Sequence, residues 1–77
     1  MRNRYLDLHG MTRDDAFLVV EDKLLSLSNV GSFTLEIITG NSKPMQDGVK
    51  EICERYNFSY FIPSHNLGMI SVTYSPL

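Results

Sequence analysis

The stretch YLDLHGMTRDDAFLVVEDKLL, residues 5–25, contains a strand pattern that runs through a glycine into a helix pattern. In its first six residues, Leu6 and Leu8 alternate with Asp7 and His9, which is the two-residue period of a strand with one buried face. We therefore expect the two leucines in the core. Asp7 and His9 are expected side by side on the other face of this strand.

A helix is expected to begin at Arg13. Thr12 is a good N-cap, and Asp15 three residues later gives a capping-box-like start in a turn that favours acidic side chains. Placed at 100° per residue, five apolar side chains fall on about one third of the circumference, which predicts an amphipathic helix that ends near residues 29–31. These side chains are Ala16, Phe17, Val20, Leu24 and Leu27. Leu18 and Leu25 form a smaller apolar spot on the opposite side, where cover by a neighbouring loop or single exposure is favoured over a partner contact.

The rest of the chain predicts three more strands and one more helix. Residues 33–39, FTLEIIT, are β-rich and bounded by glycines, and the preceding helix permits a right-handed parallel crossover. Pro44 marks the first turn of a second helix with an apolar stripe, and the runs FSYFI and MISVTY predict an antiparallel pair joined by PSHNLG. The expected core residues are Leu6, Leu8, Val20, Leu24, Ile37, Val49, Ile52 and Val72.

The order βαβαββ predicts an α/β fold of the two-layer, α+β sandwich kind, as one domain over residues 1–77. Within the second helix, Gly48 is unfavourable by roughly 1 kcal/mol relative to alanine, and we expect close helix packing to explain it. Cys53 lies on the apolar stripe of this helix. It is therefore expected in the core and not as a nucleophile.

Charge and cysteine content limit the classes of function. The net charge of −2 argues against a strongly basic surface for duplex binding, although Arg2, Arg4 and Arg13 leave a local basic patch near the first motif open. With a single cysteine and no hydrophobic leader or membrane-length apolar run, the chain is expected to be soluble and cytoplasmic, without a membrane partner.

The predicted topology brings polar residues to one edge of the sheet. The carboxyl ends of parallel strands lie together, so His9, Thr39 and the PSHNLG loop should emerge at the same edge. Both helices also begin there, and their unpaired amides and positive dipole ends suit a phosphate.

The segments LDLHGMTRDDAFLVVEDKL, IITGNS and LGMISVTY resemble the small MutS-related, or Smr, domain over nearly the whole chain. The first motif, residues 6–10, is a close match. The second family motif is a strand ending in His-Gly-x-Gly or Thr-Gly-x-Gly, and it maps onto residues 39–42 with Ser42 in place of the second glycine. Met45 and Gln46 stand where many members have Leu-Arg, so a basic residue near the phosphate is missing, and Lys43 is a candidate substitute.

The resemblance implies a mixed four-stranded sheet with two helices on one face, similar to the C-terminal domain of translation initiation factor three. It also implies nucleic-acid cleavage, as DNA nicking or RNA endonuclease action that is often linked to stalled ribosomes. RNA or DNA would then be the partner, with the ribosome as a further one, while the sequence leaves oligomeric state and pathway open.

The residues themselves suggest a site without a metal or other cofactor. A carboxylate beside an imidazole can orient it and make it a general acid or base, so Asp7 and His9 are the candidate catalytic pair. The alternative is that His9 only caps the turn and Asp7 is solvated. The candidate residues for binding nucleic acid or phosphate are Gly10, Arg13, Thr39, Gly40, Asn41, Ser42, Lys43, His65 and Asn66.

Two functions remain open on this basis. One is a small hydrolase, an endonuclease that cleaves RNA through its 2′-hydroxyl or nicks DNA, and the retained Asp7 and His9 favour it. The other is a non-catalytic module that binds RNA, the ribosome or another protein, which the altered second motif and the acidic balance favour. Tyr5, Phe61 and Met69 are weaker candidates for stacking on bases from the open sheet face.

Overall fold

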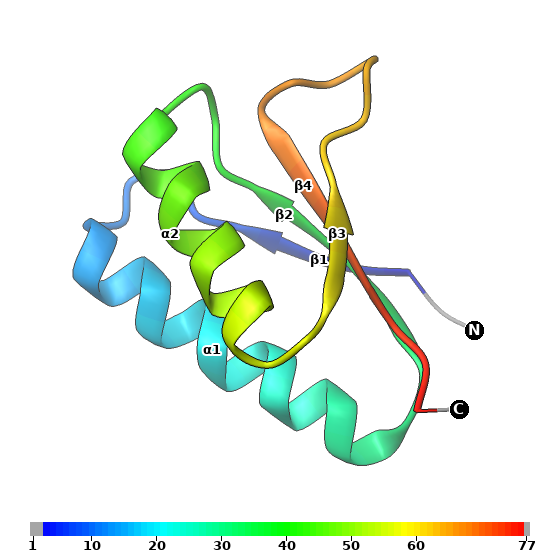
Figure 1. Cartoon of the computed structure of the whole chain (residues 1–77). Coiled ribbons are helices and arrows are strands. Elements are labelled where there is room, and N and C mark those ends of the chain that lie inside the picture. The colour runs from blue at the N-terminus through cyan, green and yellow to red at the C-terminus, as the bar shows by residue number, and fades with distance from the viewer. Residues whose placement is uncertain (1–2, 77) are drawn as a thin grey trace.

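The structure is a computed structural model that describes residues 3–76. Two helices cover one face of a four-stranded mixed sheet, and the other face is left open (Figure 1). The strands are β1 (Asn3–Asp7), β2 (Phe33–Ile38), β3 (Ser59–Phe61) and β4 (Met69–Tyr74), and the helices are α1 (Arg13–Val30) and α2 (Lys43–Arg55). This confirms the predicted order and fold class.

The sheet has the strand order β1-β2-β4-β3. Strand β1 pairs parallel to β2, whereas β4 runs antiparallel to both β2 and β3. Because β1, β2 and β3 all end at the edge where β4 begins, the three loops after them lie at that edge.

Helix α1 begins at Arg13, as Thr12 predicts, and Pro44 lies in the first turn of α2, as predicted. The Thr12 hydroxyl accepts a hydrogen bond from Asp15 N at the start of α1, and Ser42 Oγ accepts one from Met45 N at the start of α2. Gly31 ends α1 with a positive φ of 144°. The end of α1 at Val30 therefore agrees with the predicted boundary.

The core lies between the helices and the sheet and contains seven of the eight predicted residues. Leu6 is the exception, because it is half-buried at the edge strand and packs against the core without lying inside it. On β2 the buried residues alternate strictly with half-buried ones, as expected for a strand covered on one face. The seven confirmed residues are Leu8, Val20, Leu24, Ile37, Val49, Ile52 and Val72.

Gly48 lies where α1 and α2 approach each other. A Cβ atom at Gly48 would lie 2.1 Å from Cζ of Phe17, so the Phe17 ring occupies the space that any larger residue would need. The expected explanation, close helix packing, is confirmed. The second apolar spot on α1 is smaller than its spacing suggested, since Leu18 is exposed but Leu25 is half-buried.

This packing gives a testable result for Gly48→Ala. In a helix interior, alanine is more stable than glycine by about 1 kcal/mol. The clash with Phe17 should cancel that gain, since overpacking costs about 1–3 kcal/mol. In a Phe17→Ala background, we expect Gly48→Ala to stabilise the protein by up to about 1 kcal/mol in urea denaturation. An equal gain in both backgrounds would contradict the contact.

Candidate functional site

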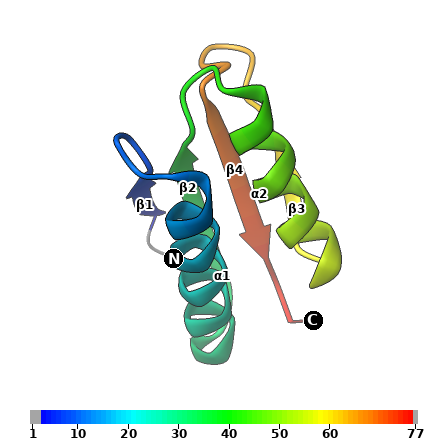
Figure 2. The ribbon, with the colours of Figure 1, turned by 90° about the vertical axis from the view of Figure 1, so that its left-hand side faces the viewer.

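Three loops lie at the edge of the sheet described above, with the first set apart at one side of the other two, and we call them the loop rim: residues 8–12, 39–42 and 62–68 (Figure 2). In the first loop, Leu8 N donates a hydrogen bond at 3.0 Å to the O atom of Ile38, the last residue of β2, and the second and third loops are joined by one from Thr39 N to Gly68 O at 2.9 Å. Both helices start at the loop rim, as predicted. It contains every candidate residue except Asp7, Arg13 and Lys43, which directly adjoin it.

The first loop differs from the prediction at His9. Strand β1 ends at Asp7, so Asp7 and His9 do not share a strand face. The Asp7 carboxylate instead accepts a hydrogen bond from the backbone N–H of His9 at 2.9 Å, and Gly10 follows with a φ of +80°. An aspartate whose carboxylate accepts a hydrogen bond from the amide two residues later forms a local turn, the Asx-turn, and this turn ends the strand.

Asp7 therefore positions His9 through its main chain. The His9 side chain is exposed, and its ring makes no hydrogen bond to any residue within the described range 3–76. The imidazole is thus free to meet a ligand at the loop rim. The expected carboxylate–imidazole contact is absent from this structure, so a catalytic role for Asp7 would have to act through the backbone of His9.

In the second loop, the hydrogen-bond donors of Thr39 and Gly40 are already paired with carbonyl oxygens of the protein. Both backbone amides donate to Gly68 O, at 2.9 and 3.0 Å, and the Thr39 hydroxyl lies 2.9 Å from Gly40 O. Thr39 is also buried. Gly40 has a φ of +68°, a left-handed conformation that favours glycine at this turn. These two residues shape the turn, and their amides are not open to a phosphate.

The next residues of this loop are better placed for an anion. Asn41 and Ser42 are exposed, and within the described part of the chain their backbone N–H groups donate to no other residue. Lys43 is at the first position of α2, and its ammonium lies 3.2 Å from the Asp47 carboxylate. This pair is largely exposed and one turn apart, so it holds the lysine weakly and leaves it available to a phosphate.

The third loop carries His65 and Asn66, both exposed. Asn66 is partly committed, because its Oδ1 accepts a hydrogen bond from Gly68 N at 3.1 Å. Asn66 N also donates to Pro63 O at 3.1 Å, which closes a turn. The His65 side chain makes no hydrogen bond within residues 3–76. The first and the third loop of the rim therefore each carry one exposed histidine without a hydrogen-bond partner in that range.

Charge near the loop rim is mixed. Arg13 is exposed at the start of α1, but Asp14 and Asp15 follow in the same turn. Arg2 and the side chain of Arg4 lie outside the part of the chain that the structure describes, so Arg13 is the described member of the predicted basic patch, and Lys43 adjoins the second loop. Among the described side chains, the loop rim is therefore of mixed charge and not strongly basic.

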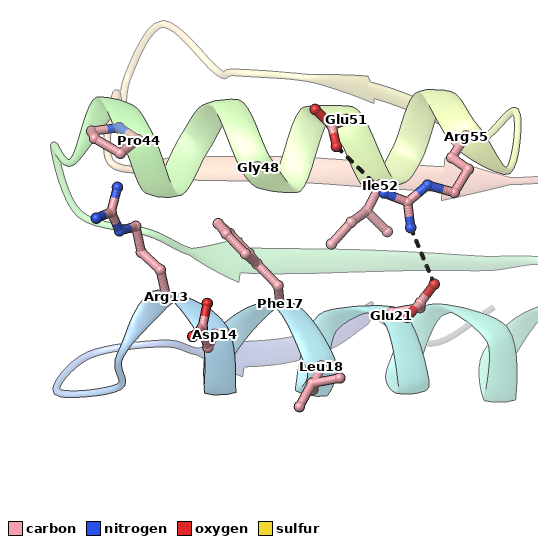
Figure 3. Close-up of a pocket in the computed structure, with 10 residues that line it drawn as sticks. All are labelled: Arg13, Asp14, Phe17, Leu18, Glu21, Pro44, Gly48, Glu51, Ile52 and Arg55. Atoms are coloured by element: carbon pink, nitrogen blue, oxygen red, sulfur yellow. Dashed lines mark hydrogen bonds and ion pairs between the residues drawn. The ribbon is translucent and has the colours of Figure 1, made fainter.

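A groove of about 660 Å³ lies between the outer sides of α1 and α2 (Figure 3). Phe17, Gly48 and Ile52 line it, and Arg55 of α2 forms an ion pair at 3.4 Å with Glu21 of α1 and another at 3.4 Å with Glu51 on its own helix. Sequence patterning missed this groove, because it arises from the packing of two helices. Of the candidate site residues, Arg13 alone lines it.

The open sheet face matches the prediction only in part. The pairing of the strands places Tyr5, Glu36, Ser71 and Phe61 in one row across the sheet. Tyr5 and Phe61 are 67% and 56% exposed at the two edges, but Met69 is buried. Met69 lies on the interior strand β4 between neighbouring side chains, so it is not a stacking surface.

Two further classes of site are not formed by the described residues. Cys53 is buried, and burial raises the pKa of its thiol to about 11, so it is a core residue, as predicted, and not a thiolate nucleophile at neutral pH. Residues 3–76 contain no group of three His, Cys, Asp or Glu side chains that could hold a metal ion. In the same range, no helix is long and apolar enough to cross a membrane.

Comparison with known proteins agrees with the two motifs at the loop rim. The Smr domain family matches residues 6–65 of the 77. Its members bind nucleic acids, and some of them cleave nucleic acids. No curated protein and no solved structure matches the chain. Since the match spans well over half of the sequence and includes two of the three loops of the rim in full, the chain belongs to the Smr domain family.

Proposed function

We propose that this chain binds nucleic acid at the loop rim and that it cleaves RNA there. The observation that carries the proposal is that His9, the free amides of Asn41 and Ser42, and two helix N-termini all lie at the same edge of the sheet. Helix N-termini and unpaired amides favour anions, and the exposed imidazole of His9 at the same edge is the residue type most used for proton transfer. Family membership supports a nucleic acid as the source of the phosphate.

In the proposed reaction, His9 removes the proton from a ribose 2′-hydroxyl, and the resulting oxygen attacks the adjacent phosphorus atom. The bond between phosphorus and the 5′-oxygen then breaks, which leaves a 2′,3′-cyclic phosphate and a 5′-hydroxyl end. His65 is the candidate acid that gives the leaving oxygen its proton. The amides of Asn41 and Ser42, with Lys43, would stabilise the negative charge that develops on the phosphate oxygens.

The charge of the loop rim favours a single-stranded substrate. Duplex binding without sequence preference depends on many phosphate contacts, and this chain has a net charge of −2. Arg13 and Lys43 are the described basic side chains that adjoin the rim. A flexible single strand can place one or two phosphates against them without bringing a second strand near Asp14 and Asp15. We propose that these contacts occur in the cytoplasm and extend to RNA on ribosomes.

Lys43→Ala should weaken binding of a single-stranded RNA and lower the slope of log K against log salt concentration by about 0.7, the loss of one phosphate contact. Fluorescence anisotropy at several salt concentrations measures both quantities. Lys50→Ala, which removes a lysine further along the same helix, is the control and should leave the slope unchanged. Equal changes in the two variants would show that Lys43 makes no specific contact.

A non-catalytic binding module is the second candidate, and the structure provides a specific observation in its favour. The Asp7 carboxylate bonds to the backbone of His9 and leaves the ring without an orienting partner. The two functions are separated by incubating the purified protein with labelled single-stranded RNA and with supercoiled DNA. Cleavage of RNA to a cyclic phosphate end supports the proposal, whereas binding without any cleavage would leave the binding module.

A further inference from the structure

Gln46 connects two loops of the rim. Its side-chain nitrogen Nε2 lies 2.8 Å from Leu67 O, 3.0 Å from Gly40 O and 3.3 Å from Thr39 Oγ1. An amide nitrogen has two hydrogens, so the two shorter contacts are its main hydrogen bonds. Because Gly40 and Leu67 belong to the second and third loops, one side chain from the first turns of α2 bridges both.

The backbones of these loops also approach each other closely. Gly68 O accepts hydrogen bonds from Thr39 N and Gly40 N, and it lies 3.2 Å from Thr39 Oγ1. A Cβ atom at Gly68 would lie 3.3 Å from both Cα and the carbonyl carbon of Gly40, which is tighter than ordinary contact. The third loop is therefore fixed to the second one at Gly68, and Gln46 closes the same junction from the side of α2.

This junction bears on His65. Within the third loop, the turn from Pro63 to Asn66 and the bond between Asn66 and Gly68 make a braced segment whose far end is the junction. His65 lies inside this segment. The position of His65 relative to the phosphate site at Asn41 and Ser42 is thus set through Gly68 and Leu67, the two residues that the second loop and Gln46 hold.

We propose that Gln46 is a positioning residue that holds the third loop, and with it His65, beside the phosphate site of the second loop. This inference rests on the proposed function, because His65 is positioned for nucleic acid bound at the loop rim. The Gln46 side chain is neutral, so it holds the two loops together without adding a positive charge to the loop rim. A substrate that places few phosphates at the rim, such as single-stranded RNA, agrees with this low positive charge.

The junction itself is tested on the free protein. Gln46→Met keeps the side-chain length but removes the donors, and Gln46→Glu places a carboxylate against two carbonyl oxygens. Hydrogen exchange of the Thr39 and Gly40 amides should become roughly tenfold faster or more in both variants, since at least two hydrogen bonds are lost. Lys50→Met introduces the same residue elsewhere on α2 and should leave both amides unchanged. Unchanged exchange in the Gln46 variants would overturn the junction.

The positioning role is tested by a double-mutant cycle on RNA cleavage. If Gln46 acts through His65, then Gln46→Met should lower the rate by a factor similar to that of His65→Ala, and the double variant should be no slower than either one. If the rate reduction of the double variant equals the product of the two single reductions, the residues act independently and the positioning role is overturned. If the parent binds no RNA although the exchange result holds, the proposed function fails and Gln46 is only a structural connection between loops.

Discussion

Leu24→Ala is expected to lower the free energy of unfolding by about 2–5 kcal/mol, which is the range for truncation of a core leucine. Leu24 has no exposed surface and lies on the face of α1 that packs against the sheet. A chain of 77 residues has a small core, and domains of this kind are stable by only about 5–15 kcal/mol. The variant should therefore be partly unfolded at moderate temperature.

Urea denaturation followed by circular dichroism measures this loss. Leu18→Ala is a matched control, because it makes the same change on the same helix at a side chain that is 66% exposed. We expect the control to change the free energy of unfolding by less than about 0.5 kcal/mol. A larger loss for Leu18 than for Leu24 would mean that α1 packs through its other face.

The second large effect is expected at His9. General acid-base catalysis contributes roughly 10²–10⁴-fold, so His9→Ala should lower the rate of RNA cleavage by about that factor. The fold should be unaffected, because the His9 side chain is exposed and outside the core. Single-turnover cleavage of a single-stranded RNA measures the rate, and Asn29→Ala, an exposed change near the other end of α1, is the control.

Asp7→Asn and Asp7→Ala should differ in their rates of RNA cleavage, because only the first keeps an acceptor for the hydrogen bond from His9 N. Asp7→Asn keeps an oxygen that can accept from His9 N, so its rate should stay close to that of the parent. Asp7→Ala removes the acceptor and should slow cleavage, because the turn that presents His9 is loosened. An Asp7→Asn rate as low as that of Asp7→Ala would instead point to a need for the negative charge near the ring.

The order of elements and most of the core could be predicted from local pattern. Thr12 and Pro44 mark the starts of the two helices within one helical turn, and the strand of Leu35 and Ile37 is indicated by its β-rich composition between two glycines. The prediction that the first strand continues through His9 was wrong for a local reason that the alternating pattern does not show. The hydrogen bond that His9 N donates to the Asp7 carboxylate, together with the left-handed Gly10, ends the strand two residues earlier than predicted.

The remaining features of the site depend on contacts that are distant in the sequence. Gln46 reaches Leu67, which lies 21 residues away, and this contact exists only once the third loop has folded onto the second one. The amides of Thr39 and Gly40 looked open because their acceptor, Gly68, is likewise far along the chain. Periodicity and motif spacing describe single elements and therefore miss such junctions.

Binding of nucleic acid at the loop rim is tested by an NMR titration of the whole chain with a short single-stranded RNA. We expect the amide resonances of residues 9–13, 41–43, 45 and 64–67 to shift together and saturate at one RNA concentration. Shifts confined to the groove around Leu18 and Ile52 or to the open sheet face around Tyr5, with the loop rim silent, would contradict it.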